Sequence, residues 1–147
     1  MSREWSLRFA DDHGISGTFA LTLDPASLDS RGRATFSARL VLPEVGVVVV
    51  HDDDVAPPRR EQLVVRAEGL WAELVCETVG EHWSFGLEAF GVRFDDEQEA
   101  ATSDRGERVA VGFDLEWETP DHVYGEILLG RRHLEFDGTG SFTAPPC

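Results

Sequence analysis

The sequence predicts an all-β fold, an antiparallel up-and-down meander of about nine or ten strands that forms a barrel or a strongly curved sheet. Apolar and polar residues alternate with a period of two almost from one end to the other, and no helical periodicity is present. Short clusters of Gly, Asp and Pro separate the alternating runs, as turns do between antiparallel strands. We expect residues 1–147 to form a single β-barrel domain, because this length suits one domain.

The first two strands are predicted to form a hairpin. Apolar residues alternate with polar ones at 5–9 and again at 15–23. A three-residue loop that ends in a left-handed Gly14 pairs Leu7 with Phe19, and this keeps both apolar sets on one side of the hairpin.

The next segments predict two strands and a loop. A strand is expected at 34–42, and the continuous valine run at 45–50 indicates a strand covered on both faces. Segment 51–61 combines Asp and Pro and is expected to be a loop. Its three adjacent acids lack the spacing of a calcium-binding loop, so no metal site is predicted there or elsewhere.

The rest of the chain predicts further antiparallel strands. They are expected at 62–68, in a hairpin at 68–94, at 108–119 and on both sides of a turn within 123–136. The polar segment 95–107 between them predicts a flexible loop over one mouth of the barrel.

The hairpin at 68–94 is the most informative segment. If its turn is a two-residue loop at Gly80-Glu81, one side of the ribbon becomes almost wholly apolar and is expected to face the core. The other side mixes acids with large aromatic residues and puts Glu73 directly opposite Glu88. Like charges that face each other across strands destabilise the pair unless something compensates.

Two interpretations of this acid pair stay open. If the face lines a closed cavity, one acid would stay protonated beside an ionised one, which is an arrangement suited to proton transfer. If the face lies outside, both acids point into water and are screened. The candidate catalytic residues are Glu73, Glu88 and His82, and the candidate ligand-binding residues are Trp71, Phe90, Tyr124 and Glu116.

Charge excludes several classes of partner and chemistry. The formal net charge is −15, from 28 acids against 13 bases, and lysine is absent. This balance repels phosphate backbones and anionic lipid, so neither nucleic acid nor a membrane is an expected partner. Without lysine there is no Schiff-base chemistry and no P-loop, and no dinucleotide fingerprint is present, so no cofactor is expected.

The cysteines and the apolar runs predict a cytoplasmic protein. Only Cys76 and Cys147 occur, which does not indicate a disulfide framework. The charged, alternating N-terminus does not resemble a secretory signal. The longest apolar run, at 45–50, is far too short to cross a membrane.

Several short motifs carry a resemblance to a known family: Gly69-Leu70-Trp71-Ala72-Glu73, Cys76-Glu77-Thr78, Glu81-His82-Trp83-Ser84, Gly86-Leu87-Glu88-Ala89-Phe90 and Asp114-Leu115-Glu116-Trp117-Glu118. The chain resembles the N-terminal half of the lipocalin-like proteins grouped with carotenoid hydratases, which include two-domain actinobacterial members and cyclases of natural-product pathways. The resemblance implies a lipocalin-like (calycin-type) barrel for an apolar, polyene-like or polyketide-like molecule. Where such proteins continue into a second half, this sequence has residues 141–147, so no catalytic residue is carried over.

Two functions are therefore expected as alternatives. The first is cofactor-free isomerisation, cyclisation or hydration of a lipophilic small molecule in secondary metabolism, with the acid pair moving the proton. The second is a non-catalytic carrier that holds or sequesters such a molecule. A homodimer that tightens as salt rises is also expected, because half of a two-part fold would expose apolar surface and unpaired strand edges. A closed monomeric barrel is the alternative.

Overall fold

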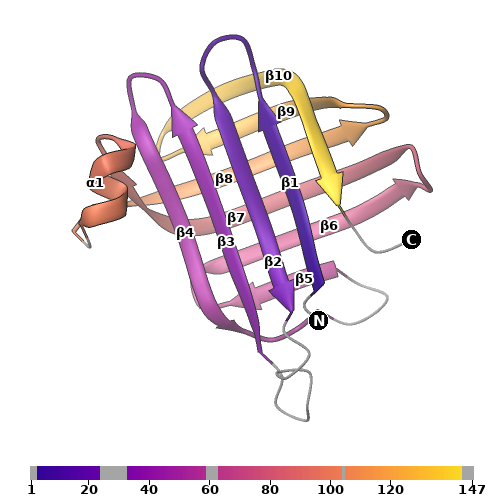
Figure 1. The fold of residues 1–147 in the computed structure, drawn as a ribbon, viewed down its shortest axis with the longest axis horizontal. Helices are drawn as coiled ribbons and strands as arrows, with labels where there is room; N and C mark the ends of the chain where they lie inside the picture. The colour runs from indigo at the N-terminus through magenta and orange to yellow at the C-terminus, as the bar shows by residue number, and fades with distance from the viewer. Residues whose placement is uncertain (1–2, 24–32, 59–62, 104, 144–147) are drawn as a thin grey trace.

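The computed structural model describes residues 3–23, 33–58, 63–103 and 105–143. Within them, ten antiparallel strands and one short helix follow in chain order: β1 (Arg3–Ala10), β2 (Ser16–Leu23), β3 (Ala34–Leu42), β4 (Gly46–Val55), β5 (Leu63–Ala67), β6 (Leu70–Thr78), β7 (His82–Phe94), α1 (Glu97–Thr102), β8 (Glu107–Glu118), β9 (His122–Leu129) and β10 (Arg132–Thr143). The strands form one sheet in the order β4-β3-β2-β1-β10-β9-β8-β7-β6-β5. The predicted all-β meander is thus confirmed (Figure 1).

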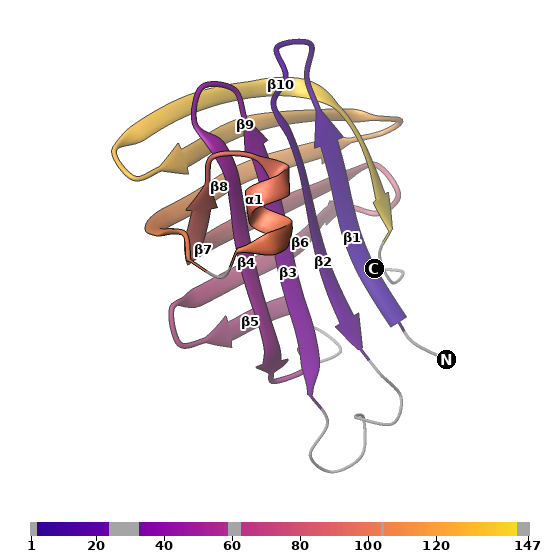
Figure 2. The same ribbon diagram turned by 60° about the vertical axis from the view of Figure 1, so that its left-hand side comes forward.

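The sheet closes on itself where β4 meets β7. Val47 pairs with Phe94 and Val49 with Val92, which joins the strands from β4 round to β7 into a ring. β6 and β5 continue the sheet beyond this ring. Figures 1 and 2 show β1 to β4 crossing the β6 to β10 layer. Buried side chains from both layers form one apolar core.

Aromatic and aliphatic side chains fill the interior of the barrel. The ring centroid of Phe19 on β2 lies 5.5 Å from that of Phe85 on β7 and 6.0 Å from that of Phe113 on β8. The ring centroid of Phe9 on β1 lies 5.1 Å from that of Phe136 on β10. Among the residues that the structure describes, no polar or charged side chain is buried. Opposite walls of the barrel therefore touch through their side chains at this level, as expected for a ring of this size.

Several sequence-based expectations are confirmed in detail. Leu7 pairs with Phe19 in the first hairpin, and Gly14 in its turn has a φ of 91°. In the valine run, Val47 and Val48 point to opposite faces and both are buried, so that strand is covered on both sides. Figure 2 shows α1 lying beside β4 on the outside of the barrel.

Two segments that were expected to be loops contain regular structure. β4 continues to Val55, because its backbone pairs with Ala34 of β3 and this pairing outweighs the acidic composition. Residues 59–61 of the same expected loop lie outside the described residues. The segment 95–107 contains α1, whose first turn is capped by Asp96: its side chain accepts a hydrogen bond of 2.7 Å from the backbone N–H of Glu99.

Cys76 lies half-buried on the inner side of β6 and is disulfide-bonded, which the sequence analysis did not predict. Cys147 lies outside the described residues. In the part of the chain that the structure describes, no helix is both long and apolar enough to cross a membrane.

Candidate functional site

The structure places all the candidate residues on one surface, the outside of β6 to β9, which we call the outer acidic face. Its members are Trp71, Glu73, His82, Glu88, Phe90, Glu116 and Tyr124. Their neighbours along the strands, such as Leu74 and Leu87, are buried in the core, so alternation turns the candidates outward. Of the two interpretations of the acid pair, the geometry supports the one in which the acids face solvent.

Glu73 and Glu88 do not face each other across the hairpin. Glu73 is opposite Gly86, and Glu88 is opposite Trp71. The turn spans three residues, 79–81, with its glycine at a φ of 72°, and a bulge follows beside it. Pairing therefore slips by two residues relative to a two-residue loop. A slip of two residues keeps every side chain on its face, so the core-facing side of the hairpin was predicted correctly. The prediction that Glu73 lies opposite Glu88 was wrong.

Glu116 is the centre of a hydrogen-bonded cluster on the outer acidic face. His82 Nε2 lies 2.7 Å from Glu116 Oε2, and the Ser84 hydroxyl donates to the same oxygen at 2.6 Å. Ser84 Oγ also lies 2.9 Å from a carboxylate oxygen of Glu77. The backbone register explains the cluster, because Ser84 and Glu116 are cross-strand partners.

The cluster is not arranged for nucleophilic catalysis. A nucleophilic serine passes its proton to a histidine that an acid orients. Here Ser84 and His82 both bond to Glu116 instead of to each other. The side chains of His82 and Glu116 remain 29 % and 30 % exposed, so water competes for both. We interpret the cluster as a set of side-chain hydrogen bonds that stabilises the pairing of β7 with β8.

Tyr124 also points away from the barrel interior. Its hydroxyl donates a hydrogen bond of 2.9 Å to Glu118. This hydrogen bond, with smaller contributions from burial and from nearby carboxylates, raises the pKa of Tyr124 above its ordinary value. The Tyr124 hydroxyl therefore does not reach the barrel interior, because its neighbour Val123 takes the inward position.

The two aromatic candidates are partly covered by other groups of the chain. The ring of Trp71 lies against Gly86, where an added Cβ would be 3.1 Å from the indole. Phe90 is 54 % exposed, and the Arg108 guanidinium carbon lies 4.4 Å from its ring centroid. These contacts are cross-strand packing of aromatic side chains on a solvent-facing sheet.

A second candidate site lies inside the barrel, in a cluster of four rings that we call the aromatic end. It consists of Trp83, Phe85, Trp117 and Phe142. The ring of Phe142 lies 4.9 Å from Trp83, 4.8 Å from Phe85 and 5.8 Å from Trp117. Trp83 and Phe85 are buried, whereas Trp117 and Phe142 are half-buried, so this cluster leads from the closed core towards the surface.

One polar atom at the aromatic end has no partner. Among the described residues, Trp117 Nε1 is the one buried side-chain nitrogen or oxygen without a hydrogen bond. The alternation along β8 places Trp117 on the inner face, where it packs against the core. No sequence signal shows that its N–H lacks an acceptor. The Ser84–Glu116 contact was missed because it depends on the β7–β8 register.

Comparisons with known proteins add no identity to these sites. No protein-family model, no curated protein and no solved structure matches this chain. In the described part of the chain, no group of three or more His, Cys, Asp or Glu side chains is placed to hold a metal ion. The function must therefore be inferred from the geometry of the two sites.

Proposed function

We propose that the protein binds a lipophilic small molecule at the aromatic end of its barrel and holds it without chemical change. The Trp117 indole N–H carries this proposal. A buried donor without an acceptor costs about 1–3 kcal/mol, and such groups in folded proteins call for an explanation. A carbonyl or hydroxyl oxygen of a ligand would accept this hydrogen bond and remove the cost.

The surroundings of Trp117 define the ligand class. Apolar walls with one or a few fixed polar groups are typical of small-molecule sites. The aromatic end supplies ring faces from Trp83 and Phe142 and a single donor from Trp117. A polyene, polyketide or terpenoid-like molecule with one oxygen acceptor fits that combination and agrees with the family resemblance of the sequence.

Carriage is favoured over catalysis because the candidate acids and bases lie elsewhere. Glu73, Glu88 and His82 are on the outer acidic face, across the sheet from the aromatic end. No buried polar or charged side chain occurs among the described residues to move a proton inside the barrel. A disulfide such as that of Cys76 is rare in cytosolic proteins and so argues against the cytoplasmic location expected from the sequence.

The test compares β-ionone, a terpenoid ketone, with a hydrocarbon analogue that lacks the carbonyl, using tryptophan fluorescence and calorimetry. Trp117→Phe keeps an aromatic ring and removes the N–H. We expect it to weaken β-ionone binding about fivefold or more and to leave hydrocarbon binding unchanged. Trp71→Phe, on the outer acidic face, is the matched control and should change neither affinity.

Three results would contradict the proposal. They are absence of binding for both probes, equal β-ionone affinity in the Trp117→Phe variant and the wild type, and recovery of chemically altered ligand after incubation.

The unliganded Trp117→Phe variant should be at least as stable to urea as the wild type, because it no longer buries an unpaired donor.

A further inference from the structure

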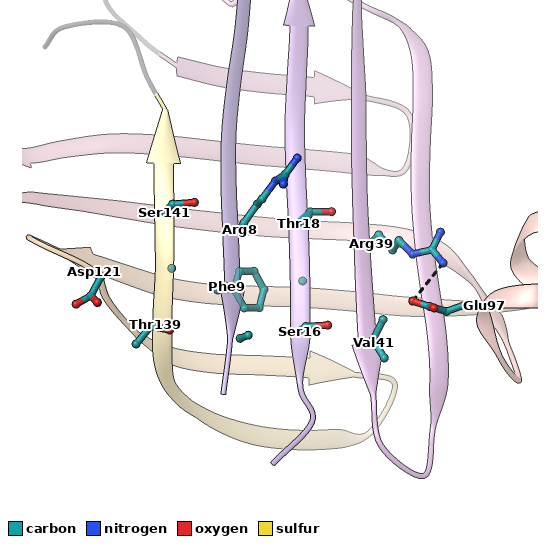
Figure 3. Close-up of a pocket in the computed structure, with 13 residues that line it drawn as sticks. Arg8, Phe9, Ser16, Thr18, Arg39, Val41, Glu97, Asp121, Thr139 and Ser141 are labelled. Atoms are coloured by element: carbon teal, nitrogen blue, oxygen red, sulfur yellow. Dashed lines mark ion pairs between the residues drawn. The ribbon is translucent and has the colours of Figure 1, made fainter. Parts of the chain in front are cut away.

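A shallow groove crosses the outside of the barrel over β10, β1, β2 and β3, away from both sites described above. Its volume is about 520 Å³, within the range of small-molecule sites. Ser16, Thr18, Thr139 and Ser141 contribute hydroxyl groups, and Arg8 and Arg39 contribute guanidinium groups. Figure 3 shows Glu97 of α1 at one edge of the groove and Asp121 at the other.

The strand register places the cationic and hydroxyl groups in one row. Ser141 pairs with Arg8, Arg8 with Thr18, and Thr18 with Arg39. Partners in such a row have Cβ atoms about 4.5–5.5 Å apart on the same face of the sheet. The row therefore alternates hydroxyl, guanidinium, hydroxyl and guanidinium, with the Thr18 hydroxyl between the two arginines (Figure 3).

The two arginines are unusually available for a chain of net charge −15. Arg8 takes part in none of the ion pairs found within the described residues. Arg39 meets Glu97 at 3.6 Å, with the side chains 42 % and 68 % exposed. An exposed ion pair of this length is weak and exchanges readily for a better partner.

We propose that this groove binds a sugar phosphate or a similar anionic, polyhydroxylated small molecule. Guanidinium groups bind phosphate oxygens in forked, charge-assisted hydrogen bonds, so the phosphate lies between Arg8 and Arg39 above Thr18. Hydroxyl groups donate and accept hydrogen bonds with equal ease, so Ser16, Thr139 and Ser141 suit the sugar hydroxyls. The groove is larger than a phosphate ion requires, which favours the composite ligand over the free anion.

The test titrates glucose 6-phosphate, inorganic phosphate and glucose separately into the whole protein at low ionic strength, followed by calorimetry and NMR. We expect glucose 6-phosphate to bind more tightly than phosphate, and glucose to bind undetectably. Arg8→Gln should weaken glucose 6-phosphate binding about tenfold or more. Glu97→Gln should strengthen it, because it frees Arg39 and removes a negative charge from the groove.

Arg132→Gln is the matched control, because it removes the same charge from an exposed position at the far end of β10. It should leave the affinity nearly unchanged. Arg8 is exposed, so Arg8→Gln should fold, and circular dichroism checks this directly. The proposal is overturned if none of the three compounds binds, if phosphate binds as tightly as glucose 6-phosphate, or if Arg132→Gln weakens binding as much as Arg8→Gln.

Discussion

The only tyrosine of the chain, Tyr124, donates its phenolic proton to Glu118 on the outer acidic face. Ionisation of the phenol would remove the donated proton and leave two negative charges side by side. The folded state therefore holds this proton more tightly than the unfolded chain does, which is why the pKa is raised. The resulting stability is fully present below the ordinary tyrosine pKa of about 10 and is lost as the pH rises through the folded value.

Absorbance at 295 nm can follow this residue alone. We expect the phenol of the folded protein to titrate above pH 10, and Glu118→Gln to lower its pKa because the neighbouring charge is gone. Glu88→Gln, on the same face but without contact to Tyr124, is the control and should leave the titration unchanged. An unaltered titration in Glu118→Gln would show that Glu118 does not hold the proton.

The sequence predicted the strands and their buried faces more accurately than it predicted the cross-strand partners. Leu7 with Phe19 was predicted correctly, because the glycine-containing turn of that hairpin fits the apolar pattern in one register. The turn at Gly80 suits both a two-residue and a three-residue loop. A two-residue loop and a three-residue loop followed by a bulge differ by two residues in register and so keep the same faces, and the hydrophobic pattern could not choose between them.

The same limit applies to the candidate sites. That Glu73, His82 and Glu88 share a face follows from alternation and from the need to keep the apolar residues of both strands on one side, and the structure agrees. Whether that face looks inward or outward depends on how the whole sheet curves, which no local pattern fixes. The unpaired N–H of Trp117 depends on what surrounds it in three dimensions, so it could be found only in the folded structure.

Closure of the barrel depends on a close approach at Gly46. Gly46 has a φ of 123°, and an added Cβ would lie 2.1 Å from the backbone oxygen of Phe94. Gly80 also has a positive φ, but an added Cβ would meet nothing within 4 Å. An alanine at position 80 therefore meets backbone strain alone, whereas an alanine at position 46 also meets a steric clash at the β4–β7 junction.

We expect Gly46→Ala to lower the free energy of unfolding by about 2–4 kcal/mol, through strain and displacement of β4 from β7. Gly80→Ala should cost only about 1 kcal/mol, because it carries the strain alone. Urea unfolding measures both values. Equal losses in the two variants would mean that the β4–β7 junction contributes little to the stability of the barrel.

Closure of the ring changes the reason to expect a dimer. The sequence-based expectation assumed a sheet with open edges and an uncovered apolar face. In the structure β4 pairs with β7 inside one chain, so the fold needs no second copy to close. Within the described residues, β5 ends the strand order and pairs with β6 alone, and Phe90 and Leu128 are the large apolar side chains exposed on strands β7 and β9.

Association should therefore be weak and controlled by salt. The net charge of −15 makes two copies repel each other at low ionic strength, and we expect a monomer there by light scattering. At about 1 M salt the Debye length falls to about 3 Å, so repulsion is screened and the free edge of β5 can pair with another copy. Val64→Glu adds a charge to that edge and should suppress the association, whereas Phe90→Glu adds the same charge elsewhere and should not. A stable dimer at low salt would contradict this prediction, and equal effects of the two variants would show that charge alone, and not β5, controls association.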